Sequence, residues 1–235
     1  MIYKNITTGR FIDRSNRFIA HVEIGSVTET VHVKNTGRCT ELLIPGAEVV
    51  LSKSDNPKRK TKYDLIAVYK EKLGLINIDS QAPNHVVQEW LEELPFDLVK
   101  PEYTYDKSRI DFYMEKGNNR FLLEVKGCTL EINGIGYFPD APTERGVKHL
   151  HELRKAVEEG YIAAVAFAIP MPKVVKALPN DQTQPEFGEA LREAVETGVK
   201  VLYLPCIVKP DEVVVDREKA SYLNSGFLST VISEV

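Results

Sequence analysis

The sequence predicts an α/β chain in which a small all-β part comes first and an α/β part follows. Three observations support this fold class. Apolar and polar residues alternate before residue 80, helical and buried-strand patterns take turns after residue 83, and no long linker separates the two parts. A length of 235 residues suits one large domain or two small ones. We therefore expect domains at residues 1–82 and 83–235.

The first part is predicted to be a β-barrel. Residues 17–24 and 27–33 alternate apolar with polar side chains, as half-buried strands do. Three more candidate strands cover 47–53, 62–70 and 73–78, with Gly- or Pro-containing turns along the stretch. Five short strands in succession favour a small closed barrel, and we expect one of OB-like form.

The second part is predicted to hold a partly parallel sheet covered by helices. A helix is expected after Pro83, with Asn84 as its N-cap, and a second helix is expected to begin at Thr143. Between them, residues 109–116 and 120–127 are predicted to form a hairpin across Gly117. Strand, helix and strand then alternate toward the C-terminus, which predicts an α/β layer.

The net charge of −4 argues at first against a nucleic-acid binder, but the charge is unevenly distributed. Residues 1–80 carry 13 Lys and Arg against 9 Asp and Glu, whereas residues 81–235 carry 17 against 25. The sharpest basic cluster contains Lys58, Arg59, Lys60 and Lys62 beside a predicted turn. Such a loop suits contact with phosphates, and a solvated basic loop is the alternative.

Three residues of the predicted hairpin are candidates for catalysis. Glu124 and Lys126 lie on one face of their strand, and Asp111 on the partner strand can join them. Two carboxylates and an ammonium group suit Mg²⁺ or Mn²⁺, and a metal-dependent phosphodiesterase needs these groups. The alternative is a solvated strand edge on which Glu124 and Lys126 form a surface pair.

Longer motifs resemble one protein family. SRIDFY, EVKGCTL and FPDAPTERGVKHL in the second part, with NTGRCTELLIPG and INIDSQAPN in the first, are similar to the sugar fermentation stimulation protein A (SfsA) family. The resemblance runs from about residue 10 to about residue 203. It implies an N-terminal OB-like domain, a C-terminal PD-(D/E)xK nuclease-like domain, DNA binding and a link to the regulation of sugar metabolism.

The resemblance also assigns roles to residues of the second part. Asp111, Glu124 and Lys126 match the nuclease-like motif, Val125 would lend its carbonyl to the metal, and Arg109 would contact phosphate.

In the helix that follows, Arg145 and His149 border the apolar face and could line a groove that binds nucleic acid, whereas Lys148 points away from the core. A histidine satisfied within the structure is the alternative for His149.

In the barrel, Arg38, Lys58, Arg59, Lys60 and Lys62 are the expected contacts to the DNA backbone, without sequence preference. Three separated cysteines and the absence of a long apolar segment favour a cytoplasmic protein, nucleoid-associated if bound to DNA, without a membrane partner. The sequence does not decide whether the chain forms a homo-oligomer.

Three functions are left open by the sequence. The first is DNA binding combined with Mg²⁺-dependent nuclease activity, and the second is a catalytically silent DNA-binding regulator of sugar metabolism genes. The third is an OB-fold module for protein interaction. The resemblance favours DNA binding over cleavage, and the division into a basic and an acidic part argues against the third function.

Overall fold

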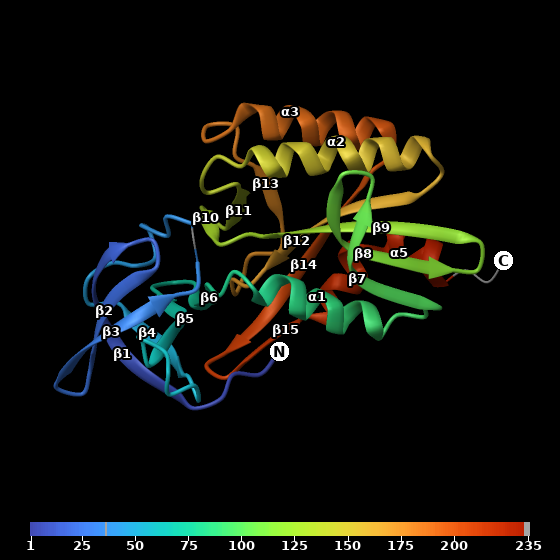
Figure 1. Cartoon of the computed structure of the whole chain (residues 1–235). Coiled ribbons are helices and arrows are strands. Elements are labelled where there is room, and N and C mark those ends of the chain that lie inside the picture. The colour runs from blue at the N-terminus through green and yellow to red at the C-terminus, as the bar shows by residue number, and fades with distance from the viewer. Residues whose placement is uncertain (36, 233–235) are drawn as a thin grey trace.

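The computed structural model describes residues 1–35 and 37–232, in which a β-barrel lies beside an α/β domain (Figure 1). The predicted α/β fold class with an N-terminal barrel is confirmed. Within these residues, no helix combines the length and the apolar character needed to cross a bilayer.

The barrel is a closed sheet of five strands extended by a sixth. The order is β3-β2-β1-β4-β5-β6, and a parallel pairing of β3 with β5 closes the ring. Inward-facing side chains such as Ala20, Val22 and Val31 are buried, as the alternation predicts. The strands are β1 (Ile6–Asn16), β2 (Ile19–Ile24), β3 (Val27–Val33), β4 (Glu48–Lys53), β5 (Tyr63–Lys70) and β6 (Gly74–Asn77).

Strand β1 was not expected from the sequence, and β6 was predicted at the right place but lies outside the closed ring. The segment ITTGRFIDRSN of β1 has little apolar alternation, and Phe11 is its only buried residue. Its pairing with both β2 and β4 makes it a strand nonetheless, because backbone hydrogen bonds do not depend on apolar side chains. β6, expected as a barrel strand, pairs only with β5 and leads out toward the second domain.

The α/β domain is a six-stranded sheet between two helical layers. The strand order is β15-β14-β12-β9-β8-β7, with β9, β12 and β14 parallel. Helices α2 and α3 cover one face, and α1, α4 and α5 pack against the other (Figure 1). The elements of this sheet are α1 (Ala82–Glu92), β7 (Leu98–Tyr105), β8 (Ser108–Lys116), β9 (Asn119–Gly127), α2 (Glu144–Glu158), β12 (Ile162–Ile169), α3 (Pro185–Thr197), β14 (Lys200–Lys209), β15 (Glu212–Val215), α4 (Arg217–Leu223) and α5 (Ser225–Ile232).

A small second sheet connects β9 to the helical layer. It contains β10 (Leu130–Ile132), β11 (Ile135–Phe138) and β13 (Ala177–Pro179), strands that were not predicted from the sequence. The predicted N-cap of α2 is confirmed, since the Thr143 hydroxyl accepts a hydrogen bond from the Gly146 amide at 3.0 Å.

The first three residues of the chain pair with the far edge of the second domain. The Tyr3 amide donates to the Asp211 carbonyl at 2.8 Å, and Ile2 forms a bridge with Glu212 on β15. The chain therefore passes from the α/β domain into the barrel before β1 and returns after β6, where the predicted boundary at residues 82–83 falls in the first turn of α1.

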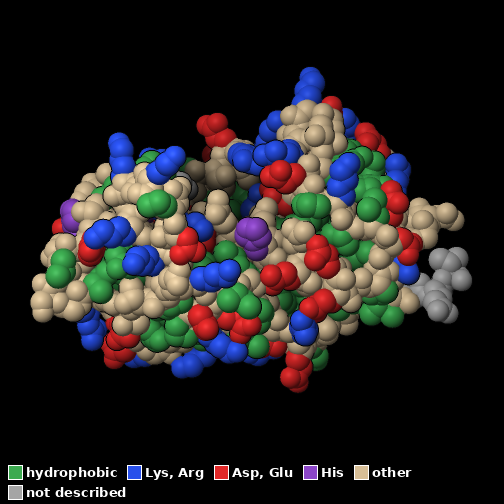
Figure 2. Space-filling view, turned by 60° about the horizontal axis from the view of Figure 1, so that its bottom comes forward, with side chains coloured by type: hydrophobic (Ala, Val, Ile, Leu, Met, Phe, Trp, Pro, Cys, Tyr) green, Lys and Arg blue, Asp and Glu red, His purple; other side chains and the backbone are tan. Residues whose placement is uncertain are grey.

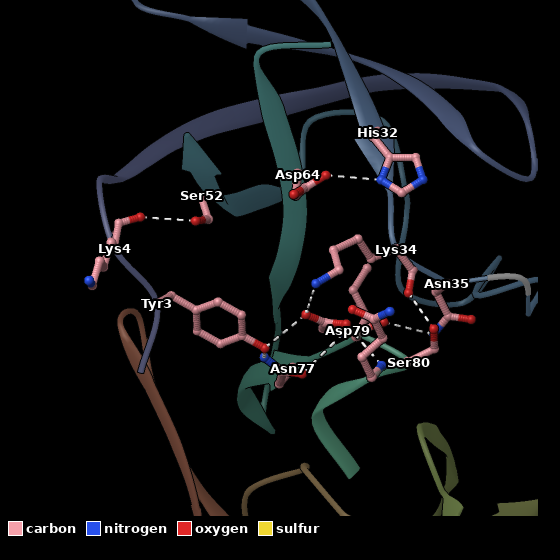
Figure 3. A network of polar contacts seen from close by, with 12 residues as sticks. Tyr3, Lys4, His32, Lys34, Asn35, Ser52, Asp64, Asn77, Asp79 and Ser80 are labelled. Carbon is pink, nitrogen blue, oxygen red and sulfur yellow. Dashed lines mark hydrogen bonds and ion pairs between the residues drawn. The ribbon is translucent and has the colours of Figure 1, made fainter. Parts of the chain in front are cut away.

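A buried polar network around Asp79 holds this junction together (Figure 3). The Asp79 carboxylate accepts hydrogen bonds from Lys34 Nζ at 2.7 Å and from the Tyr3 hydroxyl at 3.2 Å. Asn77 Nδ2 donates to the same hydroxyl at 3.0 Å. Residues from the N-terminal segment, the end of β3 and the end of β6 are thus joined at one carboxylate.

We predict that Asp79→Ala lowers the free energy of unfolding by about 3 kcal/mol, because it leaves the Lys34 ammonium group and the Tyr3 hydroxyl without their buried partner. Chemical denaturation followed by circular dichroism measures the change. Glu71→Ala, at an exposed position on the turn after β5, is the control and should stay within about 0.5 kcal/mol of the wild type. Equal effects for the two variants would contradict a structural role for the network.

Candidate functional site

The candidate site forms where strands β8 and β9 separate. Their antiparallel ladder runs from Lys116 and Asn119 to Phe112 and Leu123 and then stops. Beyond this point β8 continues to pair with β7, and β9 continues to pair with β12. The next pair in register is Asp111 and Glu124, so both carboxylates stand at the opening between the strands.

Asp111 is held at the opening by two hydrogen bonds. The Val125 amide donates to Asp111 Oδ2 at 2.7 Å, in place of a ladder bond between the strands. Asn84 Nδ2, in the first turn of α1, donates to Asp111 Oδ1 at 2.8 Å. Because each carboxylate oxygen has a second lone pair, Asp111 can still bind a cation.

Glu124 is buried and uses only one of its two carboxylate oxygens. It is 3% exposed, and its Oε1 accepts hydrogen bonds from Lys126 Nζ at 2.6 Å and from His149 Nδ1. Its Oε2 is buried and has no hydrogen-bond partner among the described residues. A buried carboxylate oxygen without a partner is costly, which makes this atom a candidate ligand position.

His149 lies beneath the site on α2 and is also 3% exposed. Arg145 Nε donates to its Nε2 at 3.3 Å, so the ring proton is assigned to Nδ1, from which His149 donates to Glu124. The side chain therefore orients Glu124 and is satisfied within the structure. This is the alternative that the sequence analysis left open for it, whereas Arg145 itself is exposed.

The two carboxyl groups have opposite pKa shifts. Burial and the negative charge of Glu124 raise the pKa of Asp111 above its ordinary value. Burial would also raise the pKa of Glu124, but the hydrogen bond from His149 and the charge of Lys126 outweigh it, and the pKa of Glu124 lies below its usual range. The charge of Lys126 lowers the pKa of Asp111 but does not outweigh burial and the charge of Glu124, and a bound cation would add the missing positive charge.

The residues present fit a cation that keeps much of its hydration shell. Within residues 1–35 and 37–232, no three His, Cys, Asp or Glu side chains converge on one point, so the chain offers the carboxylates of Asp111 and Glu124. Mg²⁺ binds through one or two carboxylates plus water and substrate phosphate, whereas Zn²⁺ usually needs three or four protein ligands. The Glu124 Oε2 atom is the position that such an ion would satisfy.

Two other basic residues named from the sequence, Arg109 and Lys148, lie at the surface of this domain. Arg109 is exposed, and its guanidinium lies 3.4 Å from the carboxylate of Glu102 on β7. Lys148 is exposed beside Glu152, as the helical period predicts. Glu89 on α1 binds the N-terminal ammonium group.

The predicted basic residues of the barrel differ in how free they are. Lys58 and Lys60 are exposed, and Lys62 is exposed but paired with Glu29 at 3.1 Å. Arg59 makes two hydrogen bonds to the Asp64 carboxylate, at 2.8 and 2.5 Å, which already use its planar donor face. Figure 2 shows Lys and Arg side chains interspersed with Asp and Glu over one face.

A groove between the two domains leads to the site. The cavity nearest the site, which we call the interdomain cavity, has a volume of about 240 Å³ and is lined by Asn84 and Val125 of the α/β domain and by Asn35 and Ile78 of the barrel. A second depression of about 520 Å³ shares Gly37, Phe138 and Asp140 with it and extends to Arg17 and Arg38. Arg38 therefore lies along the route to the carboxylates, and Figure 2 shows a hollow between the halves of the molecule.

Asn84 is not the N-cap that was predicted from the sequence, and its contact with Asp111 was not expected. The helix begins earlier, with Gln81 at the N-cap and Pro83 in the first turn, where a proline is favoured. Pro83 also packs closely on the strand, because a Cβ at Gly127 would stand 2.8 Å from its Cγ. Proline favours the first turn of a helix, so Pro83 could have indicated that Asn84 lies inside α1. The hydrogen bond from Asn84 to Asp111 depends on the tertiary fold and could not be predicted in this way.

Comparisons with known proteins cover nearly the whole chain. Family models described as "SfsA N-terminal OB domain" and "Sugar fermentation stimulation protein RE domain" match residues 12–78 and 81–212. The sugar fermentation stimulation protein homologs of Ruminiclostridium cellulolyticum and Clostridium beijerinckii are each 53% identical to it, over 93% and 91% of this chain and 98% and 96% of their own length. The structure of Pyrococcus furiosus SfsA in complex with Ca²⁺ aligns with a TM-score of 0.80 at 28% identity, covering 92% of this chain and 95% of that one.

We predict that Asp111→Asn stabilises the protein at neutral pH in the absence of divalent cations, by an amount on the order of 1 kcal/mol. The pKa of Asp111 is higher in the folded protein than in the unfolded chain, so ionised Asp111 destabilises the folded state above the folded-state pKa. Below the ordinary pKa of an aspartate, Asp111 is protonated in the folded and in the unfolded protein, and the destabilisation is absent. The gain in thermal stability should therefore be present at pH 7 and disappear as the pH falls through the folded-state pKa toward and below 3.8. A gain that stays constant over this range would contradict the electrostatic cause.

Proposed function

Since the chain belongs to the sugar fermentation stimulation protein (SfsA) family, we propose that it is a DNA-binding protein whose α/β domain hydrolyses phosphodiester bonds with Mg²⁺ or Mn²⁺. The observation that carries the proposal is the buried Oε2 of Glu124, which has no hydrogen-bond partner among the described residues and lies near the carboxylate of Asp111 and the ammonium group of Lys126. The Ca²⁺ complex of the Pyrococcus furiosus relative supports a divalent cation in this family.

In this proposal each residue of the site has one task. Asp111 and Glu124, with the Val125 carbonyl, would hold the cation, which when bound polarises the phosphate and lowers the pKa of a water molecule. Lys126 is 9% exposed and uses one of its three N–H donors on Glu124. A further donor can stabilise negative charge that develops on the phosphate. Asn84 and His149 keep the two carboxylates in position.

DNA is the proposed substrate because exposed basic residues lie along the groove and on the surface of the barrel. Arg17 and Arg38 line the groove, whereas Lys58, Lys60 and Lys62 lie on the loop between β4 and β5. Lys and Arg displace condensed counterions from the DNA backbone without distinguishing its bases. Arg59 would contribute less than the neighbouring lysines, because Asp64 already occupies its donor face.

A catalytically silent DNA-binding regulator of sugar metabolism genes is the second candidate. The observation that favours it is the short contact between Lys126 Nζ and Glu124 Oε1, which directs the ammonium group to the carboxylate as a purely structural ion pair would. In that case the fold would bind DNA without turnover. The two candidates differ in whether cleavage occurs when a divalent cation is present.

We predict that the wild type cleaves labelled DNA with Mg²⁺ or Mn²⁺, and that Asp111→Asn, Glu124→Gln and Lys126→Ala each lower the rate by about 10²–10³. Ca²⁺ titration calorimetry on the same variants should show loss of binding in the two carboxylate variants. Glu196→Gln, an exposed substitution on α3, is the control and should behave as the wild type. Calcium binding without any cleavage would support the silent regulator, and cleavage that survives Asp111→Asn would come from a contaminant.

A second prediction concerns the salt dependence of DNA binding. The logarithm of the binding constant should fall linearly with the logarithm of salt concentration, and Lys58→Ala with Lys60→Ala should reduce the slope by about 2. Fluorescence anisotropy with a labelled duplex and a labelled single strand measures it. The matched control combines Lys107→Ala and Lys200→Ala, two exposed lysines of the other domain. A slope near zero for the wild type would rule out binding through the phosphate backbone.

A further inference from the structure

We propose that the interdomain cavity binds one unpaired guanine base of the DNA strand, with the carboxylate of Asp140 accepting hydrogen bonds from the N1–H and N2–H groups of that base. The proposal deepens the proposed function and rests on it, because the strand must first bind at the candidate site. It adds a chemical preference that the carboxylate cluster alone does not give.

The cavity lies directly beside the carboxylates. Asn84 and Val125 both line it, and both donate hydrogen bonds to Asp111, at 2.8 and 2.7 Å. The cavity would therefore lie next to a phosphate bound at Asp111, on the side that faces the barrel. The base of an adjoining nucleotide is the part of the strand that would reach this space.

The size of the cavity suits one base. Its volume of about 240 Å³ leaves room for a flat group the size of one nucleobase. Ile78, Pro83, Phe138 and Pro170 supply apolar wall on both sides of the domain boundary. Apolar and aromatic walls with a few polar groups are typical of sites that bind flat organic groups.

Most of the polar groups on the cavity wall already have partners. Asn35 donates to the Ile78 carbonyl at 2.8 Å and accepts from the Gly37 amide at 2.7 Å. Asn77 donates to Tyr3 and accepts from the Asp79 amide, and Asp79 is occupied by the junction network. These groups form the wall and leave little hydrogen-bonding capacity for a ligand.

The side chains of Thr129 and Asp140 have no such partner among the described residues, and Asp140 is the charged one. Among residues 1–35 and 37–232 its carboxylate has no hydrogen-bond or ion-pair partner. The Gly37 backbone lies close against it, since a Cβ at Gly37 would stand 2.2 Å from Asp140 Oδ2. The pKa of the buried Cys128 thiol is raised to about 12, first by burial and then by the charge of Asp140.

An ionised carboxylate only accepts hydrogen bonds, so the ligand must present donors. No Lys or Arg is among the described residues that line this cavity, and a phosphate group would be repelled by Asp140. Guanine presents two adjacent donors, N1–H and N2–H, which match the two carboxylate oxygens. Adenine and cytosine place an acceptor nitrogen beside their amino group, and thymine places carbonyls on both sides of N3–H, so each brings an acceptor against the carboxylate.

The same edge of guanine pairs with cytosine in a duplex. A base read by Asp140 must therefore be unpaired, either in a single strand or turned out of the helix. The inferred substrate class is DNA with an accessible guanine next to the phosphate that binds at Asp111.

The test compares short labelled oligothymidylates that differ at one central position, which is dG, deoxyinosine, dA or dT. Deoxyinosine keeps N1–H and lacks the N2 amino group. We expect wild-type protein, measured by anisotropy with Ca²⁺ present, to bind the dG strand about tenfold more tightly than the other three. Asp140→Asn should bind all four alike, with the affinity for the all-dT strand unchanged.

Equal affinity of the wild type for dG and deoxyinosine strands, or a dG preference that survives in Asp140→Asn, would overturn the inference while leaving the proposed function intact. Failure of every strand to bind would instead refute the proposed function on which the inference rests. Glu196→Gln is the control for a charge change elsewhere and should keep the preference. Asp140→Ala provides a second variant, and thermal unfolding of both confirms that the comparison is made on folded protein.

Discussion

The buried carboxylate of Asp79 is the constraint on which the rest of the structure depends. It fixes Lys34 and Tyr3 on one side, and on the other it accepts a hydrogen bond from the Gln81 amide at 2.9 Å, at the N-cap of α1. The first turn of α1 then places Pro83 on Gly127 and Asn84 on Asp111. The junction between the domains and the opening of the candidate site are therefore set by one continuous set of contacts.

At the candidate site, stability and chemistry have opposite requirements. Two carboxylates face the same opening, and only Glu124 is compensated by donors from Lys126 and His149. Asp111 accepts from the neutral donors Asn84 and Val125, and its pKa stays raised despite the nearby charge of Lys126. Such uncompensated charge is common where a ligand completes the balance, and perturbed carboxyl groups mark functional sites for that reason.

The sequence predicted the architecture well where local pattern decides it. Alternation identified β2 and β3, and helical period placed Lys148 in solvent. Prediction from the sequence failed where residues that are distant in the chain determine the local structure. β1 is a strand because of its neighbours, and His149 is buried because Glu124 offers it a partner from another element. Arg59 forms an ion pair with Asp64, and the number of basic residues in a segment does not show which of them are paired.

The pairing of the first three residues with β15 also has a kinetic meaning. The N-terminal ammonium group bonds the Val213 carbonyl at 3.0 Å, across a separation of 212 residues. Contacts between such distant parts of a chain form late, because a long loop must close before they contribute stability. During synthesis the barrel can fold while the strand that accepts its leading segment has not yet left the ribosome. This contact between the first residues and β15 would then be among the last to form, after both domains have built their cores.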